Sequence, residues 1–189
     1  GTEFAPLVVG QDPLATERIW DMLYRSAVHG RKGMVMQALA GLDAALWDLK
    51  ARLFDVPLVR LLGAARDAIP VYGSGGFTSY TPARLAEQLD GWVRDGIAMV
   101  KMKVGRDPAA DVDRVRAARE AIAPSTALFV DANGAYSRKQ SLAFAAAYAD
   151  LGVTWFEEPV PSDDLEGLRL IRDRAPAPID VTAGEYGYD

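Results

Sequence analysis

Cysteine is absent from this chain of 189 residues. Disulfide bonds, thiolate metal sites and a cysteine nucleophile are therefore excluded. Histidine occurs only once, at His29. Because loops favour polar residues, we expect His29 to lie in a loop and to take no part in catalysis.

Long apolar runs are also missing, and none approaches the roughly 20 residues that a membrane-spanning helix needs. The first residues lack the basic and apolar regions of a signal peptide. The formal net charge is −5 and no basic cluster is present, whereas binding to nucleic acid needs concentrated Lys and Arg. We therefore expect a cytoplasmic protein with no membrane or nucleic-acid partner.

The composition is 50% hydrophobic and 25% charged, which is typical of a globular protein with a buried core. The first part of the chain, residues 1–66, is predicted to be helical. We expect helices over residues 14–27 and 34–53, and a short one over residues 58–62 that is closed by Gly63. Leucines recur every three or four residues in the long helix and predict one core-facing stripe. They are Leu39, Leu42, Leu46, Leu49 and Leu53.

The remainder, residues 67–189, alternates short apolar runs with helix-like stretches, which predicts βα units. We expect strands over residues 69–72, 98–104, 127–131, 153–157 and 179–183. Helices are predicted to open near Thr81, Pro108, Ser137 and Asp163, and Gly96 and Gly152 to close two of them.

Acidic residues mark the ends of the last three predicted strands at a regular spacing. They recur at intervals of 26 and 28 residues (157 − 131 and 185 − 157), the length of one βα unit. Such repeats favour either an open doubly wound sheet or a TIM-type (β/α) barrel. We favour the barrel, because polar residues follow several consecutive strands. About five units are visible, so we expect an incomplete barrel, since a full one needs about 250 residues.

These acidic residues, Asp131, Glu157 and Glu185, are candidate metal ligands. The C-terminal ends of barrel strands converge on one mouth, where functional residues gather. Oxygen ligands favour Mg²⁺, with Mn²⁺ as a second choice. Taken singly, each carboxylate could instead cap the following helix.

Two lysines, Lys101 and Lys103, lie on one face of their strand because side chains alternate. Facing inward near the mouth, each would disfavour the other's charged form, so one could act as a base. The alternative is an edge strand protected by lysine. Asn133 could contact the substrate or simply form a turn with Gly134. Ser74 lies in a glycine-rich segment and is a second candidate substrate contact.

Together these motifs resemble the enolase superfamily, specifically its mandelate racemase and muconate lactonising branch. The matching pieces are Lys101-Met102-Lys103, Asp131-Ala132-Asn133, Trp155-Phe156-Glu157-Glu158-Pro159 and Ala183-Gly184-Glu185. The helical segment from Gln37 to Asp48 is also similar to the link between the family's α+β capping domain and its barrel.

The resemblance implies that Asp131, Glu157 and Glu185 hold Mg²⁺, that Lys103 is a base and that Lys101 lies beside it. It also implies a capping part over residues 1–66, a catalytic barrel part over residues 67–189, and a homo-oligomer. With Glu as its third ligand, the predicted site resembles those of the mandelate racemase and acid-sugar dehydratase groups. Family members continue with further strands that carry a His-Asp pair, so we expect this chain to be a portion of a longer enzyme.

The reaction that we expect is removal of the α-proton of a carboxylate substrate to give an enediolate. Loss of a β-hydroxyl would then make the protein an acid-sugar dehydratase, whereas reprotonation would make it a racemase or epimerase. A noncatalytic binding domain that has kept the fold is an alternative of another class. A third alternative is a barrel enzyme that binds phosphate with its late loops.

Overall fold

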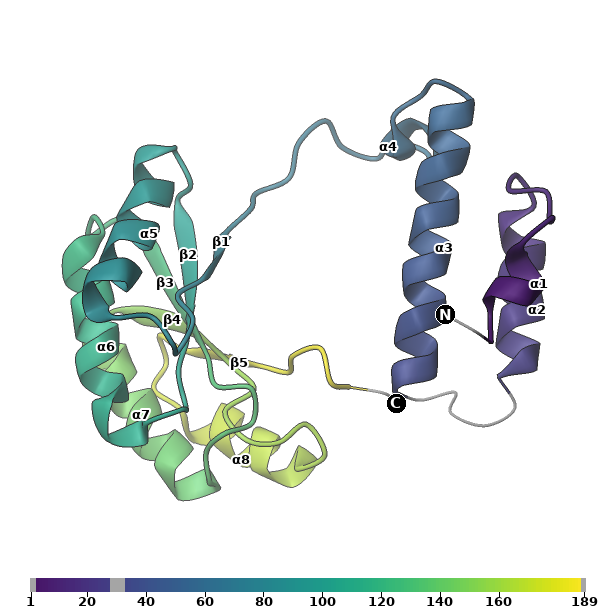
Figure 1. Cartoon of the computed structure of the whole chain (residues 1–189). Helices are drawn as coiled ribbons and strands as arrows, with labels where there is room; N and C mark the ends of the chain where they lie inside the picture. The colour runs from purple at the N-terminus through teal and green to yellow at the C-terminus, as the bar shows by residue number, and fades with distance from the viewer. Residues whose placement is uncertain (1–2, 28–32, 188–189) are drawn as a thin grey trace. The chain divides into compact units, whose positions relative to one another are not determined.

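The computed structural model describes residues 3–27 and 33–187 (Figure 1). They form two compact units: the first extends to Ile69 and the second begins at Pro70. The prediction for His29 lies outside the described residues. Across the described ranges, every helix is too short or too polar to cross a membrane.

The first unit is helical. It contains α1 (Ala5–Val8), α2 (Thr16–Ser26), α3 (Met34–Leu53) and α4 (Leu58–Leu61). The predicted bounds of the long helix coincide with α3, whereas the one-turn α1 was not predicted. The leucine stripe of α3 is only partly core-facing. Leu39 is buried against α2, but Leu49 and Leu53 are 40% and 56% exposed. The prediction for these two leucines was therefore wrong within this unit, because α2 is shorter than α3 and covers only part of it.

The second unit alternates strands and helices. Its strands are β1 (Gly73–Gly75), β2 (Met99–Lys103), β3 (Ala127–Asp131), β4 (Val153–Glu157) and β5 (Asp180–Thr182). Its helices are α5 (Pro82–Arg94), α6 (Pro108–Ala121), α7 (Arg138–Asp150) and α8 (Leu165–Arg174).

The strands form one parallel sheet in the sequential order β1-β2-β3-β4-β5. Helices α5 to α8 lie along one side of this sheet (Figure 1). A doubly wound sheet would reverse its strand order at a switch point and carry helices on both faces. A (β/α) barrel keeps the order and places all helices outside. The α/β prediction of consecutive units of a TIM-type barrel is confirmed.

The first strand lies later in the sequence than predicted. We expected it over residues 69–72, but Ile69 and Val71 are 65% and 59% exposed and β1 begins at Gly73. A side chain on Gly73 or Gly75 would clash with Trp92 of α5. Close packing of the helix on the backbone therefore determines the position of β1, and apolar patterning could not reveal it.

The helix starts follow the predicted caps. The Thr81 hydroxyl accepts the backbone N–H of Arg84, and Ser137 forms a capping box with Gln140. The cap of α8 is Asp164, one residue later than expected. Side-chain acceptors satisfy N–H groups that the first helical turn leaves unpaired.

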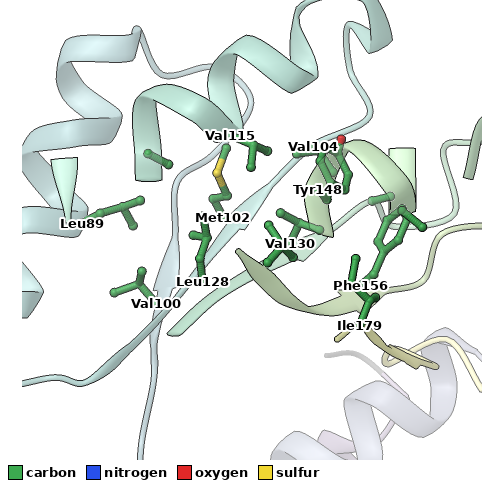
Figure 2. Packing of buried hydrophobic residues seen from close by; sticks show 14 of the residues in the cluster. Leu89, Val100, Met102, Val104, Val115, Leu128, Val130, Tyr148, Phe156 and Ile179 are labelled. Carbon is green, nitrogen blue, oxygen red and sulfur yellow. The ribbon is translucent and has the colours of Figure 1, made fainter. Parts of the chain in front are cut away.

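The core lies between the sheet and its helices. Val100 and Met102 of β2 point toward Leu89 and Val115 in Figure 2, and all four are fully buried. Since side chains alternate along a strand, Lys101 and Lys103 must occupy the opposite face of β2. The packing of the apolar side chains thus positions both lysines on the helix-free side of the sheet.

Candidate active site

Strand register brings the predicted site residues into one row. Lys103 pairs with Asp131, and Asp131 pairs with Glu157 on the next strand. Two residues before Lys103 on β2, Lys101 pairs with Ser74 of β1. The row lies at the C-terminal ends of β2, β3 and β4, where barrel enzymes place their functional groups.

The lysines and carboxylates of this row are joined by short ion pairs. Lys101 Nζ lies 2.6 Å from Glu157 Oε2 and 3.3 Å from Asp131 Oδ2, and Lys103 Nζ lies 2.5 Å from Asp131 Oδ2. The Asp131 side chain is fully buried, and that of Lys101 is only 7% exposed. Buried charges persist only when they are paired, so these four residues form one coupled electrostatic unit.

The pKa directions reflect this coupling. Burial would raise the pKa of Asp131, but hydrogen bonds from Lys103 and from the backbone N–H of Asn133, together with both lysine charges, lower it. Burial would lower the pKa of Lys101, but the hydrogen bond to Glu157 and the charge of Asp131 outweigh burial and raise this pKa. The two carboxylates beside Lys101 therefore favour its positively charged form.

Asn133 forms the turn after β3. Its φ angle is +44°, and its backbone N–H donates to Asp131 Oδ1 at 2.9 Å. Its side chain is exposed and lines a cavity of about 460 Å³, together with Lys103 and Glu185. Asn133 thus orients a candidate ligand through its backbone and is also one of the residues that line the cavity. Ser74 is exposed and is not among the described residues that line this cavity.

Glu185 does not join the other two candidate ligands. It is exposed in the turn that follows β5, and over residues 3–27 and 33–187 no three acidic or histidine side chains are gathered closely enough to hold a metal ion. Asp131 and Glu157, in contrast, already share one cationic partner, the Lys101 ammonium. The structure therefore brings two of the three predicted carboxylates together, and it places Glu185 at the cavity that Lys103 also lines.

Glu158 adds a buried carboxylate next to this site. It is 1% exposed, has a φ angle of +41°, and neither of its carboxylate oxygens has a hydrogen-bond partner among the described residues. Burial raises the pKa of Glu158, and the charges of Glu185, Asp131 and Glu157 raise it further, whereas Asn133 acts in the opposite direction. The site therefore carries surplus negative charge. An all-oxygen donor set with this surplus fits a hard divalent cation such as Mg²⁺.

A pH prediction follows from Glu158. Its folded pKa lies above the unfolded value of about 4.3, so its stabilising contribution is present at low pH and is lost as the pH rises through the folded pKa. Metal-free Glu158→Gln protein should therefore lose less stability than the wild type as the pH rises above about 4. Urea denaturation in EDTA measures this difference. Glu87→Gln, on the exposed face of α5, is the control. Parallel profiles for Glu158→Gln and the wild type would contradict the role of Glu158.

Two family models together cover nearly the whole chain. Residues 1–63 match the N-terminal domain of the mandelate racemase / muconate lactonizing enzyme family, and residues 84–189 match the Enolase C-terminal domain-like model. The chain belongs to the mandelate racemase/muconate lactonizing enzyme family of the enolase superfamily. The resemblance inferred from the sequence motifs is confirmed.

Known members of this family are similar over almost all of the chain. A D-galactarolactone cycloisomerase from Agrobacterium fabrum is 34% identical over 95% of this chain and 50% of its own length. An L-talarate/galactarate dehydratase from Salmonella typhimurium is 35% identical over 94% of this chain and 45% of its own length. The chain thus spans about half the length of these relatives.

Solved structures agree with this assignment. A mandelate racemase/muconate lactonizing enzyme-like protein from Rubrobacter xylanophilus is 50% identical, with a TM-score of 0.91 over 100% of this chain and 53% of its own. The structure of the Salmonella dehydratase, liganded with Mg and L-lyxarohydroxamate, has a TM-score of 0.80 over 97% of this chain and 47% of its own, at 33% identity. A structural relative of this chain therefore contains bound magnesium.

Proposed function

We propose that this family member removes the α-proton of an acid-sugar carboxylate and acts as a dehydratase. The observation that carries the proposal is the row of Lys103, Asp131 and Glu157 at three adjacent strand ends, with Lys101 bridging the two carboxylates. Residues 67–189 would contribute this catalytic part, and residues 1–66 part of a capping domain. A noncatalytic domain would have no need to bury two lysines and two carboxylates in contact, because burying charges is costly.

Lys103 is assigned as the base. It borders the cavity, whereas Lys101 is more deeply buried and retains its charge through Glu157 and Asp131. In its neutral form, Lys103 would accept the α-proton, and the electron pair of the broken C–H bond would move into the substrate carboxylate. The Lys101 ammonium would offset the negative charge that develops there.

Asp131, Glu157 and Glu185 are the residues that would hold a divalent cation. Bound Mg²⁺ would supply positive charge next to the substrate carboxylate and make its α-proton more acidic. Mn²⁺ is a second candidate for the same oxygen ligands. Asn133 and Ser74 are proposed substrate contacts. A homo-oligomer and a cytoplasmic location belong to the same proposal.

Dehydration is favoured over the other outcomes because the relative at 35% identity is named as an L-talarate/galactarate dehydratase. In this reaction the β-hydroxyl takes up a proton and leaves as water, which balances the α-proton removed by Lys103, and the resulting enol tautomerises to a 2-keto-3-deoxy acid. Racemisation is the second candidate, since an N-succinyl-L-Arg/Lys racemase from Bacillus cereus is 28% identical. It would share the first proton transfer and end with return of a proton to the same carbon.

The test is a panel of aldonic and aldaric acids incubated with the intact protein and Mg²⁺ in D₂O. We expect at least one acid to lose its α-hydrogen signal in the proton NMR spectrum and to yield a 2-keto-3-deoxy acid. EDTA should stop both changes, because the charge developing on the carboxylate would no longer be offset. Exchange without loss of water would favour the racemase. No exchange with any acid in the presence of Mg²⁺ would contradict the proposed function.

A further inference from the structure

An aromatic side chain contacts the candidate metal ligand on β4. The Trp155 indole Nε1–H donates to Glu157 Oε2 at 3.2 Å. The same oxygen accepts the Lys101 ammonium at 2.6 Å. Glu157 Oε1 takes part in no hydrogen bond with the residues that the structure describes. Two donors therefore hold one oxygen of this carboxylate and leave the other free.

The orientation of the indole is itself fixed by packing. Trp155 pairs in register with Phe129 of β3, and their ring centroids are 5.5 Å apart. Phe129 in turn makes an edge contact with Tyr72 at 5.7 Å, and the Lys101 ammonium lies 5.4 Å from the Tyr72 ring. These three aromatic residues form a row next to the ion pairs. With the ring packed in this row, the indole N–H points toward Glu157.

We propose that Trp155 is a positioning residue that holds the Glu157 carboxylate ready for a divalent cation. This inference rests on the proposed function, because it takes Glu157 as a metal ligand. Hydrogen-bond partners of metal ligands fix the orientation of the ligand, and their loss typically weakens metal binding by 10- to 100-fold. Lys101 alone cannot fix Glu157 in this way, because it also contacts Asp131.

A purely structural role for Trp155 predicts a different result. If the indole only fills space beside Phe129, a phenyl ring should replace it with little effect on cation binding. Trp155→Phe keeps an aromatic ring at this position and removes only the N–H donor and part of the ring. Trp92→Phe is the matched control, because Trp92 packs against Gly73 and belongs to the apolar core on the helix side of the sheet.

The experiment is calorimetric titration of the intact protein with Mg²⁺. We expect Trp155→Phe to weaken Mg²⁺ binding by about 10-fold, while Trp92→Phe binds like the wild type. The melting temperature of metal-free Trp155→Phe should stay close to that of the wild type. Equal affinities for wild type and Trp155→Phe would overturn the positioning role and leave the proposed function intact. If the wild type binds no Mg²⁺, both the positioning role of Trp155 and the proposed function are contradicted.

An NMR measurement covers the case in which Trp155→Phe does not fold. In wild-type protein labelled with ¹⁵N-tryptophan, the Nε1–H resonance of Trp155 should move when Mg²⁺ is added, because its acceptor Glu157 changes partners. The Trp92 resonance, assigned with Trp92→Phe, should stay in place. An unmoved Trp155 resonance in protein that binds Mg²⁺ would overturn the inference.

Discussion

Replacing Lys103 with alanine is expected to abolish exchange of the substrate α-hydrogen with solvent deuterium. A positioned base typically contributes 10²- to 10⁴-fold to the rate, so exchange should fall by at least about two orders of magnitude. The physical reason is that Lys103 is the amine of the site that borders the cavity. The measurement is the rate of loss of the α-hydrogen signal in D₂O, with the Mg²⁺ affinity determined on the same variant. We expect that affinity to remain close to normal, because the candidate ligands are untouched.

Two further variants make this result specific to Lys103. Lys139→Ala removes an exposed lysine of α7 and should leave exchange unchanged. Lys101→Met should weaken substrate binding and slow exchange less than Lys103→Ala does, because Lys101 offers a positive charge to the substrate carboxylate but is not the base. A larger loss of exchange in Lys101→Met than in Lys103→Ala would reverse the assignment of the base. Normal exchange in Lys103→Ala would end it.

Much of the fold was predictable because it depends on local rules. Residues 34–53, 127–131 and 153–157 were predicted with the bounds that α3, β3 and β4 have. Caps such as Ser137 depend on hydrogen bonds between neighbours in sequence. The position of β1 was not predictable in this way, because it depends on how closely Trp92 approaches Gly73.

The candidate site was predictable to the extent that strand alternation and spacing determine it. Those rules put Lys101 and Lys103 on one face and aligned Lys103 with Asp131 and Glu157. They contain no information on which ammonium pairs with which carboxylate. We expected the two lysines to act mainly on each other, whereas the structure pairs each with a carboxylate and raises the pKa of Lys101.

Two functional candidates escaped the sequence argument. Glu158 was not among the predicted site residues, but it is a buried carboxylate with no hydrogen-bond partner among the described residues, and it lies beside the site. Trp155 was given no role in the predicted strand 153–157, and its hydrogen bond to Glu157 depends on the two side chains meeting on one face. The signal that could have revealed Trp155 is its spacing of two residues from Glu157, since residues i and i+2 share a strand face.

Removing all three candidate ligands is expected to abolish the response of the protein to Mg²⁺. The variant is Asp131→Asn, Glu157→Gln, Glu185→Gln, measured by thermal unfolding with and without the cation. A ligand that binds only the folded state at 100 times its Kd stabilises it by about 2.7 kcal/mol. The wild type should therefore melt several degrees higher in Mg²⁺, and the triple variant should show no shift.

The comparison must be made within each protein, because the variant will also be less stable without metal. Lys101 and Lys103 lose their carboxylate partners in the variant, and an unpaired buried charge is strongly destabilising. The informative quantity is thus the melting shift that Mg²⁺ produces and not the melting temperature itself. Asp113→Asn, Glu120→Gln, Glu166→Gln is the matched control, since it makes the same charge change at exposed positions. Equal shifts in the wild type and the ligand variant would mean that Mg²⁺ binds elsewhere, and Asp131, Glu157 and Glu185 would no longer be candidates for its site.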